Sequence, residues 1–99
     1  MVALTSQDVL RNRILSALSE HRDGKARRRD VLATLDREYG SLWTPEDRMS
    51  PKSRPFEANW MNRASYERAN MVRDGLLAEG DGGLWKLTEE GRSAAKKAR

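Results

Sequence analysis

The spacing of apolar residues predicts a first helix over residues 6–21. Thr5 and Ser6 are suitable N-caps, and Asp8 lies three residues after Thr5, as in a capping box. Asp23-Gly24 ends the helical pattern. The apolar residues fall three or four positions apart, as on the core-facing stripe of a helix: Leu10, Ile14, Ala17 and Leu18.

The same spacing predicts a second helix over residues 28–39, and Gly40 stands at its expected C-terminal end. The connection 24–27 is short enough to be a simple link, and it can also form a brief strand. The apolar stripe of this helix consists of Val31, Leu32, Leu35 and Tyr39.

The periodic pattern breaks over residues 41–56, which hold all three prolines. Within this long loop, Thr44-Pro45-Glu46-Asp47 predicts one short helical turn with Thr44 as its N-cap. An irregular basic stretch follows over residues 49–54. The loop therefore separates the second helix from a third.

A third helix is predicted over residues 57–74, with Gly75 at its end. Arg68 falls near the middle of its apolar side, so we expect the Arg68 stem to lie along the edge of the core. We expect Trp60 and Trp85 in the core, and the sequence leaves Trp43 open between core and loop. The apolar side of the helix consists of Trp60, Met61, Ala64, Met71, Val72 and Gly75.

The last quarter of the chain predicts a β-hairpin and a final helix. Strands over residues 76–78 and 84–87 flank a glycine-containing turn, and Thr88 caps a helix that begins with acidic residues. Three helices followed by a hairpin give a mainly α fold, a winged helix-turn-helix with a three-helix core, a two-stranded wing and a C-terminal helix. We expect residues 1–99 to form a single domain of this kind.

Composition argues against several classes of function. The chain has no cysteine and one histidine, His21, which argues against disulfides, ordinary metal sites and histidine-based catalysis. It has no P-loop, no dinucleotide fingerprint, no membrane-length apolar run and no signal peptide. We therefore expect a cytoplasmic protein that is not an enzyme, with no catalytic residues, no cofactor, no metal and no membrane partner.

Candidate chemistry lies on the side of the third helix that faces away from its apolar stripe. The net charge of +4 is weak evidence by itself, so the placement of the polar residues matters more. Asparagine pairs with adenine and arginine with guanine in the major groove. This face carries three asparagines, Asn59, Asn62 and Asn70, although asparagine disfavours a helix. The alternative is a polar surface with no function. The predicted base contacts are Asn59, Asn62, Arg63 and Tyr66.

Phosphate contacts are predicted at the start of the second helix, because helix N-termini and arginine both favour phosphate. The alternative is a solvated run of charge. The wing carries the acidic Glu79 and Asp81, so we expect a structural role for it, with Gly82 and Gly83 allowing close approach to a groove. The predicted phosphate contacts are Lys25, Arg27, Arg28, Arg29, Arg73 and Lys86.

Several stretches resemble the N-terminal winged-helix domain of Mrr-type restriction proteins. They are RRRDVL at residues 27–32, WMNR at 60–63, GLL at 75–77 and GLWKLTEEGR at 83–92. The resemblance covers residues 9–92 and implies DNA binding, as the targeting module of a nuclease that senses modified DNA. Glu67 and Asn70 depart from the pattern, because the family tends to be small, apolar or aromatic there.

Three hypotheses follow. The first is a module that binds double-stranded DNA in a restriction system, with a nuclease domain or subunit as partner. The second is a transcriptional regulator of the same fold that acts as a dimer. The last helix offers only Ala94, Ala95 and Ala98 for dimerisation, so we expect a monomer. The third is a protein-interaction module.

Overall fold

The computed structural model describes residues 3–80 and 83–98. In its first half, helix α1 (Gln7–Glu20) is followed by the 3₁₀ turn η1 (Arg22–Gly24) and strand β1 (Lys25–Arg27). Helix α2 (Arg28–Tyr39), the 3₁₀ turn η2 (Gly40–Leu42) and the short helix α3 (Pro45–Arg48) come next. Helix α4 (Asn59–Arg73), strand β2 (Leu84–Lys86) and helix α5 (Glu89–Ala98) complete the order. This mainly helical architecture is consistent with a small winged-helix-like fold.

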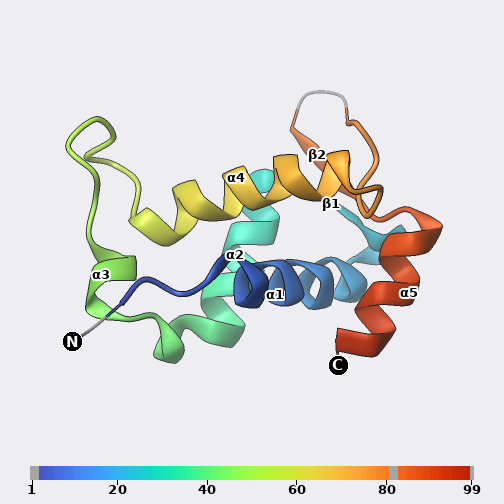
Figure 1. The fold of residues 1–99 in the computed structure, drawn as a ribbon, viewed down its shortest axis with the longest axis horizontal. Helices are drawn as coiled ribbons and strands as arrows, with labels where there is room; N and C mark the ends of the chain where they lie inside the picture. Colours follow the sequence, from blue (N-terminus) through green and yellow to red (C-terminus); the bar gives the residue numbers. More distant parts are fainter. Residues whose placement is uncertain (1–2, 81–82, 99) are drawn as a thin grey trace.

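Helix α1 lies at the centre of the packing and contacts α2, α4 and α5. Figure 1 shows α1 and α4 as the two long helices of the view, with α5 at one end of them and the loop between α3 and α4 at the other. The apolar stripes predicted for α1 and α2 supply buried residues such as Leu10, Ile14, Leu18, Val31 and Leu35. The core therefore forms between the long helices and the small sheet.

Most predicted helix boundaries are confirmed within two residues. α2 spans the predicted residues 28–39, and α3 begins with the predicted capping box between Thr44 and Asp47. Gly40 ends α2 but keeps a right-handed conformation and continues into η2. At α1, Ser6 is the N-cap and accepts a hydrogen bond from the Val9 amide, whereas Thr5 bonds to Asp47. The predicted capping box between Thr5 and Asp8 is therefore wrong.

The sheet differs from the predicted hairpin. β2 pairs with β1 in an antiparallel register that places Ala26 opposite Trp85, whereas residues 76–78 contribute a single bridge between Leu77 and Leu87. The reason lies at the end of α4, where the amides of Leu76 and Leu77 both donate to the Met71 carbonyl at 2.9 and 3.3 Å. These two amides cap the helix, so the segment pairs with the end of β2 and the residues after it only around this bridge, where the Ala78 amide donates to the Lys86 carbonyl at 2.8 Å and the Thr88 amide donates to the Leu76 carbonyl at 3.1 Å.

All three tryptophans belong to the core. Trp60 and Trp85 are buried as predicted, and Trp43, which the sequence left open, is buried as well. The rings of Trp43 and Trp60 stack with centroids 4.6 Å apart and an interplanar angle of 12°. The Arg13 guanidinium lies 5.1 Å from the centroid of the Trp43 ring, a cation–π arrangement. This stack fixes the segment after α2 against the start of α4.

Two carboxylates are buried between elements. Glu67, one of the departures from the family pattern, is only 3% exposed and pairs with Arg11 of α1 at 2.5 Å. Asp47 accepts hydrogen bonds from the Thr5 amide at 2.8 Å, the Thr5 hydroxyl at 2.5 Å and the Thr44 amide at 2.9 Å. Burial raises the pKa of Asp47, but these hydrogen bonds outweigh it and hold the pKa below its ordinary value. Asp47 thereby joins the chain start to α3.

Arg68 was predicted to lie with its stem along the edge of the core, and its half-buried side chain on α4 is consistent with that position.

Across residues 3–80 and 83–98, we find no helix that combines the length and the apolar character needed to cross a membrane.

Candidate nucleic-acid interface

The candidate interface is a groove between the outward side of α4, the start of α2 and the loop that precedes α4. Its volume is about 410 Å³. Asn62, Ser65 and Tyr66 line it from α4, because residues three and four apart lie on one side of a helix. Arg28 lines it from α2, and Arg54 and Glu57 from the loop. Segments far apart in the sequence thus meet at one surface.

The four predicted base-contact residues lie on two different stripes of α4. Asn62 is half-buried and Tyr66 is 64% exposed, and both line the groove. Asn59 donates to the Glu46 carbonyl at 2.9 Å, and Arg63 donates to the Thr5 carbonyl. In this structure, the stripe with Asn59 and Arg63 faces the protein's own backbone, and the stripe with Asn62 and Tyr66 faces outward.

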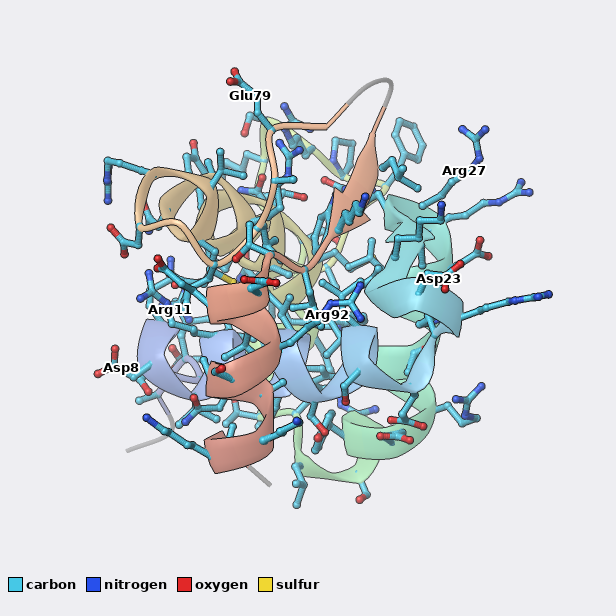
Figure 2. All side chains as sticks on the ribbon, turned by 90° about the vertical axis from the view of Figure 1, so that its right-hand side faces the viewer. Asp8, Arg11, Asp23, Arg27, Glu79 and Arg92 are labelled. Carbon is cyan, nitrogen blue, oxygen red and sulfur yellow. The ribbon has the colours of Figure 1, made fainter. Side chains whose placement is uncertain are left out.

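The predicted phosphate-contact residues surround the start of α2, apart from Arg73. Arg27 and Arg29 are exposed and line a shallow hollow of about 460 Å³ together with Gly83. Figure 2 shows the Arg27 side chain pointing away from the body of the protein. Lys25 and Lys86 are exposed and are direct partners across the sheet, so two cations stand side by side.

Arg28 differs from its neighbours because it is engaged inside the groove. Its Nε donates to the Ser65 hydroxyl at 2.8 Å, and its Nη2 pairs with the Glu57 carboxylate. Arg73 is exposed at the far end of α4, where its Nη2 donates to Asn70 at 3.0 Å. The predicted cations therefore do not form one cluster, since Arg73 is held at the other end of the helix.

Sequence reasoning missed Ser65, Arg54 and Glu57 as members of the groove. Arg54 and Glu57 are three residues apart, and the two side chains come within 3.6 Å of each other. One signal was present, because Glu57 is the first acidic residue after the basic stretch at residues 49–54. Its pairing with Arg28, 29 positions earlier in the chain, could not be seen in the sequence.

The wing contributes less to the described surface. Glu79 is exposed and points outward at the edge of the molecule (Figure 2). Gly83 is exposed with φ of 83°, a conformation that suits glycine. Asp81 and Gly82, which the sequence placed at the wing tip, lie outside the described residues.

The electrostatic character of this surface favours anions. Lys25, Arg27, Arg29 and Lys86 expose their charges on neighbouring parts of α2 and the sheet. Clustered cations attract an anionic partner and raise its rate of encounter. Over the described part of the chain, no three His, Asp or Glu side chains gather into a group able to hold a metal ion.

One of the comparisons with known proteins found a match. The family model described as the Mrr N-terminal domain matches residues 8–97, which is nearly the whole chain. No curated protein and no solved structure matches the chain significantly. The chain therefore belongs to the Mrr N-terminal domain family, a family of accessory rather than catalytic domains that is associated with restriction systems.

Proposed function

We propose that this domain binds double-stranded DNA, with α4 in the major groove and the start of α2 against the phosphate backbone. The observation that carries the proposal is the outward stripe of Asn62 and Tyr66 directly beside the cationic start of α2. The major groove of B-DNA admits an α-helix, and the helix before the recognition helix crosses the backbone in helix-turn-helix proteins.

The contacts divide into two kinds. Asn62 and Tyr66 contact base edges, since their side chains line the outer groove. Asn59 and Arg63 would have to break hydrogen bonds with the protein's own backbone before they reached a base. They are therefore secondary candidates in the proposal. The phosphate contacts come from exposed cations around the sheet and α2: Lys25, Arg27, Arg29 and Lys86.

The biological role that fits this binding is targeting. The family is associated with restriction systems, so the domain would direct a nuclease domain or subunit to DNA, and it would act as a monomer.

A preference for modified bases is the sharper form of this proposal. Titration with matched duplexes that contain unmodified, cytosine-modified or adenine-modified bases tests it, and equal affinity for all three would contradict it.

The direct test of the proposal compares variants by fluorescence anisotropy with a duplex at low salt. Asn62→Ala should weaken binding by about 1–3 kcal/mol, or roughly five- to 150-fold, if Asn62 contacts a base. Asn12→Ala is the matched control, because Asn12 is exposed on α1 and lies outside the groove. Absence of any duplex binding by the wild-type domain would overturn the proposal.

Arg29→Gln tests the phosphate contacts in the same assay. Both Arg29 and Arg37 are exposed on α2, but only Arg29 stands at its cationic start. Arg29→Gln should reduce the slope of log affinity against log salt by about one, since one phosphate contact is lost. Arg37→Gln should leave the slope unchanged, and equal effects of the two variants would argue for unspecific attraction.

Protein docking is a second candidate function, and one observation favours it. Phe56 is 98% exposed, which is unusual for a large apolar side chain, and Met49 of the same loop is exposed as well. Under this hypothesis Asn62→Ala and Arg63→Ala would leave any DNA binding intact. Loss of DNA binding in these variants would count against docking as the main function.

A further inference from the structure

The groove beside α4 holds a carboxylate in contact with two guanidinium groups. Glu57 pairs with Arg28 through Oε1, and its Oε2 lies 3.6 Å from Nη1 of Arg54. The Glu57 side chain is 20% exposed, whereas that of Arg54 is 63% exposed. The anion is thus set inside the groove, and one of its two cations remains accessible from solvent.

This arrangement satisfies the carboxylate incompletely. Glu57 Oε2 is buried, and among the described residues it has no hydrogen-bond partner. At 3.6 Å from Arg54 it gains charge attraction without a proper hydrogen bond. A phosphate has more acceptor oxygens than a carboxylate and suits planar guanidinium donors well. The same two arginines could therefore hold a phosphate more completely than they hold Glu57.

The Arg28 guanidinium is also fixed in place. Its Nε donates to Ser65 at 2.8 Å, which leaves the outer Nη2 group for the anion. Arg28 further lines the hollow that it shares with Arg27 and Arg29, so the site is continuous with the cationic start of α2. A ligand that entered the groove from that side would pass the exposed Arg27 and Arg29 and then meet Arg28.

We propose that Arg28 and Arg54 form a phosphate site that Glu57 occupies in the free protein, and that a phosphate group of nucleic acid displaces the Glu57 carboxylate on binding. The proposal rests on the proposed DNA binding and names Glu57 as a residue that weakens that binding. Glu57 acts as an internal competitor, so the affinity for phosphate is lower than the two arginines alone would give.

The test compares Glu57→Gln with Glu38→Gln, which makes the same change in net charge at an exposed position of α2 away from the groove. Anisotropy titrations with duplex DNA should show about three- to tenfold tighter binding for Glu57→Gln, with a salt slope steeper by about one. Glu38→Gln should change neither by as much. Adding Arg28→Gln to the Glu57→Gln variant should abolish the gain in DNA affinity. Equal effects of Glu57→Gln and Glu38→Gln would overturn the proposal.

A second measurement separates this site from DNA binding itself. Inorganic phosphate should shift the NMR signal of Arg28 Nε in Glu57→Gln at lower concentration than in the wild type. If wild-type protein fails to bind duplex but this shift occurs, the DNA function is wrong and the phosphate site stands. If duplex binds and neither Glu57 variant nor phosphate has an effect, only the site is wrong. Should Glu57→Gln fail to fold, Glu57→Asp, with a shorter reach, should give the same change in direction.

Discussion

At the scale of single residues, Asp47 is a buried carboxylate whose hydrogen bonds join two distant segments of the chain. It is fully buried and receives hydrogen bonds from Thr5 and Thr44 that outweigh the effect of burial on its pKa. Because the folded pKa lies below its ordinary value, the charged form stabilises the fold above the unfolded pKa. This stability is lost as the pH falls through the folded pKa.

The pH dependence of unfolding checks this account. Asp47→Asn should lower the free energy of unfolding at neutral pH by about 1–3 kcal/mol, because hydrogen bonds to a buried carboxylate are lost. The variant should also lose less stability than the wild type as the pH drops below 3.8, the ordinary value for this group. Denaturant titrations at several pH values measure both effects. With Asp36→Asn, an exposed control on α2, the curve should follow the wild type. Parallel curves for Asp47→Asn and wild type would contradict the role of Asp47.

The members of the candidate site could be predicted only in part from the sequence. Asn62 and Tyr66 were predicted as a polar stripe of the helix, and the structure places both at the groove. Asn59 and Arg63 were placed with them, although each bonds to a carbonyl of a distant segment. Hydrogen bonds across 13 and 58 positions leave no periodic signal in the sequence.

At the scale of elements, α5 depends on a glycine for its approach to the rest of the fold. A Cβ added at Gly91 would lie 2.0 Å from the Leu76 carbonyl oxygen, far inside van der Waals contact. The neighbouring Thr88 amide donates to the same carbonyl at 3.1 Å, so this segment cannot easily move away. The size of the residue at position 91 is therefore limited by backbone packing and not by helix propensity.

Gly91→Ala should accordingly lower the free energy of unfolding by about 1–3 kcal/mol, as overpacking does. Propensity alone predicts the opposite sign, since alanine favours a helix interior by about 1 kcal/mol over glycine. Ser93→Ala is the control, because Ser93 is exposed on the same helix. Thermal and denaturant unfolding of the two variants decide the matter, and a stabilised Gly91→Ala protein would refute the close approach.

Local signals predicted the elements better than their pairing. The bounds of α2 and the capping box of α3 follow from nearby apolar spacing, proline and cap residues. The partner of β2 could not be predicted in this way. Residues 76–78 form only a single bridge beside β2, and the strand that pairs with β2 along its length is β1, which begins at Lys25, 59 positions before Leu84. Strand pairing of this kind is long-range and carries no local pattern.

At the scale of the whole molecule, one surface concentrates the features that would engage nucleic acid. Figure 1 shows α4 across the molecule, with the loop after α3 at one end and the segment that leads to β2 at the other. The start of α2 and the sheet add exposed cations beside its outward stripe. α5 packs against α1 at the other side of this arrangement, and it carries none of the proposed contacts.

The most direct test of the central claim is a map of backbone amide NMR signals during titration with a duplex at low salt. Shifts should concentrate at residues 25–30, at 62–69 of α4 and at 84–86 of β2. Raising the salt concentration should reverse them, because phosphate contacts release counterions. Absence of shifts with excess duplex, or shifts confined to α5 and η2, would contradict the proposal that α4 and the start of α2 bind DNA.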